Sequence, residues 1–166
     1  MITLIVSAAI VERAGSFLVT RRQRGVHLEG YWEFPGGKCE PGESVQSCLA
    51  RELKEELNVA IRADEEVFVT RHAYPDRIVE LHFLKCELLG EPAPQLGQEM
   101  AWVERSALAS LAFPPADLEL VEWLIKSQGS RLKAESSGTL DERQIRHGSR
   151  DSIRGQRRSR NPGISV

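Results

Sequence analysis

Apolar residues along the first half of the chain fall into short runs that are typical of β-strands. Residues 2–13 are rich in Ile, Val and Ala, and an Ala-Gly turn signal separates them from a second run at residues 17–21. Residues 67–73 and 78–88 form another pair of runs around a Pro-Asp turn. Because such runs, bounded by turn residues, are typical of paired strands, we expect two strand pairs here.

Two helices and two shorter strands complete the predicted order of elements. We expect strands at residues 31–34 and 102–103, a helix at residues 43–57, and a closing helix at residues 116–126 that is entered through two prolines. Strands dominate, and the helices are inserted between them. This order favours an α+β or α/β sandwich over a regular β-α-β array.

The helix predicted at residues 43–57 carries acidic residues within and beside its apolar stripe. At about 100° per residue, Glu56 falls near the middle of that stripe, and Glu52 and Glu55 lie along one edge. Carboxylates packed against a core are destabilising unless they are paired or bind a metal, and three at this spacing repel one another. A divalent cation resolves both problems. The apolar stripe consists of Val45, Cys48, Leu49, Leu53 and Leu57.

The chemistry of these side chains and the loop before them favour a metal site. An all-oxygen ligand set suits Mg²⁺ or Mn²⁺ and not zinc. Gly36 and Gly37 allow the backbone to approach a ligand closely, and Glu43 and Ser44 begin the helix near its positive end. Asn58 follows the helix, where a left-handed residue is expected. The alternative is a solvated acidic helix face with ordinary Arg and Lys partners.

Charge divides the chain into two parts. The 166 residues have a net charge of −2, but residues 1–126 contain 13 Lys and Arg against 20 Asp and Glu, whereas residues 127–166 contain 9 against 4. The second part has no aromatic residue and no apolar period, so burial cannot offset its ordering entropy. We therefore expect one domain at residues 1–126 and a disordered basic tail at residues 127–166. A tail that touches RNA or DNA is the alternative to a solvated appendage.

The cysteine content and the hydropathy of the chain indicate the cellular compartment in which we expect the protein. The three cysteines are an odd number without a C-x-x-C pair, which argues against a disulfide framework and a structural zinc site. The longest apolar stretch is far too short to span a bilayer, and we expect no secretion signal. These features favour a cytoplasmic protein without a membrane partner.

Residues 36–59, GGKCEPGESVQSCLARELKEELNV, resemble the Nudix box G-x5-E-x7-R-E-U-x-E-E-x-G-U, where U is apolar. The one departure is Asn58 in place of the last glycine, and it is conformationally mild. Similarity to the MutT-type branch extends over roughly residues 2–125. The matching box positions are Gly37, Glu43, Arg51, Glu52, Leu53, Glu55, Glu56 and Val59, and the further matches are TRR at 20–22, His27, WEFPGGK at 32–38, PDR at 75–77 and FPPA at 113–116.

This resemblance implies the Nudix fold, an α/β/α sandwich around a mixed β-sheet. It also implies attack by water on a phosphorus within a diphosphate linkage, with Mg²⁺ as cofactor and Mn²⁺ as an alternative. Glu52 and Glu56 are the implied catalytic carboxylates, with Arg51 as their support or as an i, i+4 partner of Glu55. The implied metal ligands are the Gly36 carbonyl, Glu52, Glu55, Glu56 and Glu99.

The same resemblance implies a nucleotide pocket. Arg22 is expected to contact phosphate or sugar and Arg77 to contact base or phosphate, each with a solvated surface arginine as the alternative. His27 and Phe34 are expected to line the pocket, with structural roles as their alternatives. The implied substrate-binding set is Arg22, His27, Glu33, Phe34, Pro35, Gly36, Arg77 and Asp117.

Asp117 departs from the MutT-type pattern, which has an asparagine here that is expected to read the oxidised guanine. Asn both donates and accepts hydrogen bonds, whereas an ionised Asp only accepts. An ionised Asp117 would therefore accept a hydrogen bond from the N7–H of 8-oxoguanine or from the exocyclic amine of cytosine. The alternative is that Asp117 caps the last helix.

We therefore predict a nucleoside triphosphate pyrophosphohydrolase whose first-choice substrate is 8-oxo-dGTP, which would clear damaged nucleotides before DNA synthesis. CTP or a 5-substituted dCTP is the alternative substrate. A non-catalytic Nudix module and an RNA-binding protein acting through the basic tail are alternatives of other classes. We expect a small-molecule nucleotide as partner, no obligate nucleic acid, and a monomer or homodimer.

Overall fold

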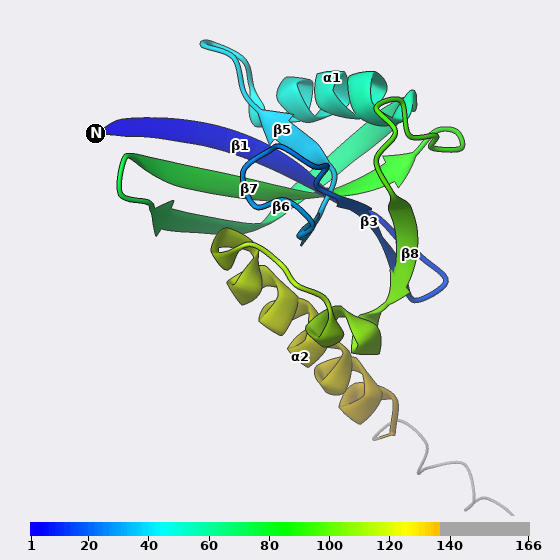
Figure 1. The fold of residues 1–166 in the computed structure, drawn as a ribbon. Helices are drawn as coiled ribbons and strands as arrows, with labels where there is room; N and C mark the ends of the chain where they lie inside the picture. Colours follow the sequence, from blue (N-terminus) through cyan, green and yellow to red (C-terminus); the bar gives the residue numbers. More distant parts are fainter. Residues whose placement is uncertain (137–166) are drawn as a thin grey trace, which may run out of the picture.

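Two four-stranded sheets form the centre of the protein in the computed structural model, which describes residues 1–136 (Figure 1). In the first sheet, β1 and β7 are parallel, and the two outer strands are antiparallel to their neighbours. The first sheet is therefore mixed. Its strands, in spatial order, are β5 (Gly36–Lys38), β1 (Ile2–Ile10), β7 (Arg77–Leu88) and β6 (Ile61–Ala73).

The second sheet is smaller and antiparallel, and it is built around β3, which pairs with the three other strands. The turn between β2 and β3 places Ala14 and Gly15 at positive φ, as a tight hairpin requires. This pairing confirms the first predicted hairpin. The strands are β2 (Glu12–Arg13), β3 (Ser16–Arg21), β4 (Trp32–Glu33) and β8 (Met100–Glu104).

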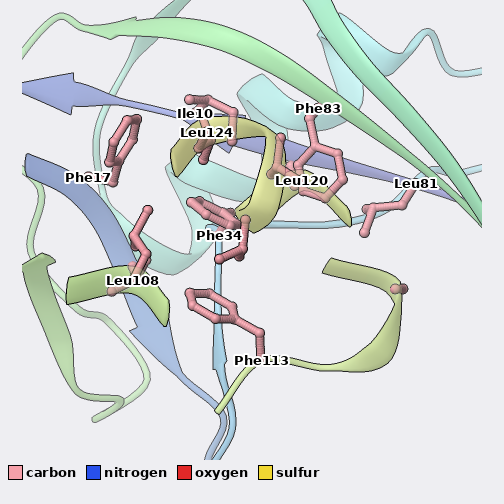
Figure 2. Packing of buried hydrophobic residues seen from close by; sticks show 13 residues of the cluster. Ile10, Phe17, Phe34, Leu81, Phe83, Leu108, Phe113, Leu120 and Leu124 are labelled. Atoms are coloured by element: carbon pink, nitrogen blue, oxygen red, sulfur yellow. The ribbon is translucent and has the colours of Figure 1, made fainter. Parts of the chain in front are cut away.

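The two helices cover opposite faces of the sheets and enclose two apolar clusters. Helix α1 (Val45–Leu57) packs Leu49, Leu53 and Leu57 against β1 and β3, and all three leucines are fully buried. On the other face, Leu120 and Leu124 of α2 (Leu118–Ser136) pack into an aromatic cluster with Phe17, Phe34, Phe83 and Phe113 (Figure 2). The predicted α/β/α sandwich around a mixed sheet is confirmed.

The short helices η1 (Arg105–Ser110) and η2 (Pro115–Asp117) lead from β8 into α2. Phe34 stacks on Phe113 with ring centroids 5.4 Å apart, so this residue is a core aromatic as well as a pocket residue. Within residues 1–136, no helix has the length and apolar character needed to cross a membrane.

Differences from the predicted elements include the start of α1, the state of residues 36–38 and the start of β6. Helix α1 begins at Val45 instead of residue 43, because the Ser44 side chain accepts from the Ser47 N–H and acts as N-cap. The glycine-rich segment at residues 36–38 is a strand, because its backbone pairs with β1. Strand β6 begins at Ile61, and its register shifts twice before Phe68, which obscures the alternation of its first half.

The predicted domain boundary at residue 126 falls inside α2, which continues to Ser136. Residues 131–135 read RLKAE, a run of good helix formers. The first ten residues of the predicted tail, 127–136, are thus described as the end of this helix. The rest of the predicted basic tail, residues 137–166, lies outside the described residues.

Close backbone contact explains the glycine at position 36. A Cβ built there would lie 2.0 Å from the Ser7 carbonyl oxygen and 2.7 Å from the Ala8 Cα. Both are backbone atoms of β1, so neither can move aside cheaply. The β5 backbone can approach β1 only because residue 36 has no side chain.

We expect Gly36→Ala to lower the free energy of unfolding by roughly 3 kcal/mol, because the new methyl group forces the strands apart. Urea denaturation measures this change. The matched control is Gly90→Ala, whose nearest neighbour would be Val59 Cγ2 at 3.8 Å, and which should stay within about 0.5 kcal/mol of the parent. Equal stability of the two variants would contradict the close approach of β5 to β1.

Candidate active site

A cavity of about 600 Å³ lies where β1, β5, α1 and the turn between β6 and β7 meet. Its volume is in the range of pockets that bind small molecules. One wall carries acidic side chains of α1, and the opposite side includes the residues around η2. Nine of the residues predicted from sequence line it: Arg22, His27, Glu33, Phe34, Gly36, Glu52, Glu56, Arg77 and Asp117.

Arg51 ties the loop before α1 to the acidic side chains of the helix. Its Nε and Nη2 donate to the two Glu43 carboxylate oxygens at 2.9 Å, and its Nη1 donates to Glu52 Oε1 at 2.8 Å. Its contact with Glu55 is longer, 3.7 Å. The hydrogen bonds from Arg51 lower the pKa of Glu43 to about 2. Arg51 thus supports Glu43 and Glu52 primarily, and the i, i+4 pair with Glu55 is secondary.

Glu52 lies directly over the backbone of Gly37. A Cβ at position 37 would lie 2.2 Å from the Glu52 Cδ, and only 14% of the Glu52 side chain is exposed. The glycine therefore leaves the space that this carboxylate occupies. Its position is fixed by Arg51 on one side and by the β5 backbone on the other.

Glu56 is half-buried and has few positive neighbours. Burial raises its pKa to about 8, and repulsion from Glu52, Glu33 and Glu55 adds to this, with only Arg22 acting in the opposite direction. A carboxyl group in such surroundings favours a proton or a cation. Glu52, Glu56 and Gly36 all line the cavity, and carboxylate and carbonyl oxygens are the ligands that suit a hard divalent cation.

The predicted convergence of three glutamates is only partly present. Glu52 and Glu56 line the cavity, whereas the Glu55 side chain is 61% exposed and is not part of the lining. In the described part of the chain, no three carboxylate, imidazole or thiol groups gather around one point. Glu52 and Glu55 both lie near the Arg51 guanidinium, at 2.8 and 3.7 Å.

Arg22 and Glu33 form an ion pair at the mouth of the cavity. Arg22 Nη1 donates to Glu33 Oε2 at 2.7 Å, and Arg22 Nε donates to the His27 carbonyl at 2.6 Å. Burial raises the pKa of Glu33, and Arg22 partly offsets this effect. Arg22 is therefore not a solvated surface arginine: it is half-buried and presents its positive charge beside Glu56.

Asp117 lies at the inner end of the cavity and is only 5% exposed. Burial raises its pKa to about 8, with a further contribution from Glu33 and a partial offset from Arg22. At neutral pH this carboxyl group is therefore largely protonated, so it both donates and accepts, and the expectation of an ionised Asp that only accepts changes accordingly. Among the described residues, its side chain makes no capping hydrogen bond to α2.

Besides Arg51 and Glu55, two further predicted site residues are not part of the cavity lining. The Glu99 side chain is 63% exposed and pairs with Arg21 at 3.4 Å, so the structure does not bring it to Glu52 and Glu56. Pro35 is fully buried, and its carbonyl accepts from the Ala9 N–H at 2.8 Å. This hydrogen bond joins the proline to the end of β1.

Two residues near the site were not identified from sequence. Tyr74 lines the cavity and makes an edge-to-face contact with His27, with ring centroids 6.0 Å apart. Its place just before the PDR turn could have indicated this role. Gln98 lies beside Glu56, and no spacing rule connects it with α1.

Arg77 lines the cavity, is exposed and pairs with Asp76.

Comparison with known proteins agrees with this geometry. The family model described as NUDIX domain matches residues 6–123, which is most of the described chain. The chain therefore belongs to the Nudix family, and it is a hydrolase of the MutT type. Hydrolases of this family depend on a divalent metal.

Relatives and solved structures agree on the same group. The chain is 37% identical to an 8-oxo-dGTP diphosphatase of Haemophilus influenzae, over 72% of this chain and 90% of the relative. It is 33% identical to a CTP pyrophosphohydrolase of Escherichia coli, over 76% of this chain and 94% of that protein. The solution structure of the E. coli ORF135 protein matches with a TM-score of 0.67 and 30% identity, covering 85% of this chain and 96% of that one.

The raised pKa of Asp117 predicts a pH-dependent cost of burying this side chain. The folded state keeps the proton up to about pH 8, whereas an unfolded Asp releases it near pH 4. Wild-type stability therefore falls, relative to Asp117→Asn, as the pH rises between these values. We expect the melting temperature of Asp117→Asn to exceed that of wild type by at least about 2 °C near pH 8, with the gap closing near pH 4.

Thermal unfolding across this pH range measures the gap. The exposed Asp64→Asn is the control, and its difference from wild type should not widen in the same way. A pH-independent gap for Asp117→Asn would contradict a neutral Asp117 in the folded protein.

Proposed function

We propose that the protein hydrolyses a nucleoside triphosphate to the monophosphate and pyrophosphate, with Mg²⁺ as the working metal and Mn²⁺ as a substitute. The observation that carries this proposal is the pair of sheltered carboxylates, Glu52 and Glu56, beside the Gly36–Gly37 backbone at one edge of a cavity of about 600 Å³. Negative charge buried at this wall requires a cation before a triphosphate can approach.

Residues of the site support separate parts of this reaction. Glu52, Glu56 and the Gly36 carbonyl would hold the metal, with Glu55 available from the solvent side. When bound, the metal neutralises phosphate charge and makes the attacking water more acidic. Arg51 fixes the Glu52 carboxylate, which would orient that water or accept its proton. Arg22 would face the phosphates from across the cavity mouth.

The base would lie toward Asp117, at the inner end of the cavity. A protonated carboxyl group presents one donor and one acceptor, the pair that the O6 and N7–H groups of 8-oxoguanine require. An ionised carboxylate presents acceptors alone and suits the amine of cytosine. We therefore infer that 8-oxo-dGTP is the preferred substrate, which would give the enzyme a role in removing oxidised nucleotides before DNA replication. The CTP pyrophosphohydrolase relative supports CTP or a 5-substituted dCTP as the second candidate.

The proposed substrate and the state of the cysteines both support a location in the cytoplasm. All three cysteines are free, as expected in the reducing cytoplasm where nucleotides are used. We place the enzyme there as a monomer or homodimer that needs no nucleic-acid partner.

Removal of the Glu56 carboxylate tests the proposed metal site. We expect Glu56→Gln to lower the rate of Mg²⁺-dependent pyrophosphate release at least about 100-fold, because the amide offers a weaker, uncharged ligand. The matched control is Glu65→Gln, the same substitution at an exposed position of β6, which should behave as wild type. Full activity of Glu56→Gln would disprove the site.

The protonation of Asp117 tests the proposed base preference. We expect the ratio of kcat/KM for 8-oxo-dGTP to kcat/KM for CTP to fall as the pH rises through about 8, because the donor is then lost. The ratio cancels effects of Glu56 that act on both substrates alike. Asp117→Asn should make the ratio independent of pH. A wild-type ratio that is already pH-independent would remove Asp117 from base recognition.

A further inference from the structure

The C-terminal end of α1 is capped by a loop from a distant part of the chain. The last carbonyl groups of a helix have no partner within it, and here two of them accept from residues 93–98. The Ala93 N–H donates to the Leu57 carbonyl at 2.8 Å, and the Gln95 N–H donates to the Glu56 carbonyl at 2.9 Å. The Gln98 side chain adds a second donor to the Glu56 carbonyl, from Nε2 at 3.0 Å.

Gln98 uses both ends of its amide group. While Nε2 donates to Glu56, Oε1 accepts from the Leu96 N–H at 2.9 Å. The side chain is half-buried and faces a small hollow next to the main cavity, together with Glu56, Glu33 and Arg22. This amide is therefore held at both ends beside a proposed metal ligand.

The loop that carries Gln98 is also fixed to β3, the strand that leads into Arg22. The Arg21 N–H donates to the Glu99 carbonyl at 3.0 Å, and Gln23 Nε2 donates to the Leu96 carbonyl. The loop thus joins the end of α1, where Glu56 lies, to the segment that places Arg22. Arg22 and Glu56 both line the hollow that Gln98 faces.

We infer that Gln98 is a positioning residue for the hydrolysis, acting through the backbone of Glu56. This inference rests on the proposed role of Glu56 as metal ligand. Two donors on one carbonyl limit the movement of the last turn of α1, so the Glu56 carboxylate keeps its place opposite Arg22. Without the Gln98 amide, that turn keeps only the backbone donors, and the ligand loses its defined position although the fold remains.

The test is Gln98→Met, which keeps the length of the side chain and removes both hydrogen bonds. Small displacements of a reacting group or ligand support cost about 10- to 100-fold. We therefore expect kcat to fall by that factor while KM changes less than about threefold, because Gln98 does not line the main cavity. Binding of Mn²⁺ alone, measured by calorimetry, should weaken about 10-fold. Gln46→Met, an exposed glutamine on α1, is the control and should match wild type in each measurement.

Each other outcome has a defined meaning. Wild-type kcat and Mn²⁺ affinity in Gln98→Met would overturn the inference, and so would a drop in melting temperature with unchanged kcat per folded molecule. If Gln98→Met does not fold, Gln98→Glu replaces it, since it keeps the acceptor for Leu96 and loses the donor to Glu56. It should show the same loss of kcat, and wild-type kcat would overturn the inference. If Glu56→Gln is inactive and Gln98→Met behaves as wild type, only the positioning role of Gln98 is disproved. If Glu56→Gln is active, the proposed function itself is disproved.

Discussion

Carboxyl groups removed from water at one cavity are the constraint on which the rest of this structure depends. Glu52, Glu56, Glu33 and Asp117 all line the same space. Within residues 1–136, Arg51 and Arg22 are the cations that hydrogen-bond to them. Burying like charges is costly unless they are paired, protonated or bound to a cation. Because these carboxyl groups are buried and have few positive neighbours, the pKa values of Glu33, Glu56 and Asp117 are raised.

Apolar packing on both faces of the sheets stabilises the fold against the cost of these buried carboxyl groups. The leucines of α1 are fully buried against β1 and β3, so the helix is anchored on its apolar side. The cluster around Phe34 and Phe83 holds the other face, with α2 packed on it. Because both helices are anchored by apolar packing, the carboxylates can remain where they are electrostatically unfavourable, which is typical of functional sites.

The two arginines act on different parts of the site. Arg51 links Glu43 in the loop to Glu52 in the helix, so the acidic face of α1 has a fixed internal partner. Arg22 pairs with Glu33 and lines the cavity together with Glu56. The proposed roles of these residues would give the cavity a metal-binding part and a phosphate-binding part, which suits a substrate carrying both a metal and phosphates.

The sequence alone determined the features that depend on local spacing. The positions of Glu52 and Glu56 on the helix and its left-handed end at Asn58 follow from helical geometry, and the succession of strands along the chain follows from short apolar runs. Tertiary structure alone decided which acidic groups share the cavity, because desolvation sums over segments distant in the chain. It placed Glu99 outside the cavity, brought Gln98 to the end of α1, made a strand of residues 36–38, and raised the pKa of Asp117. None of these features could be predicted from neighbouring residues in the sequence, because each depends on backbone or charged groups of segments that are distant in the chain.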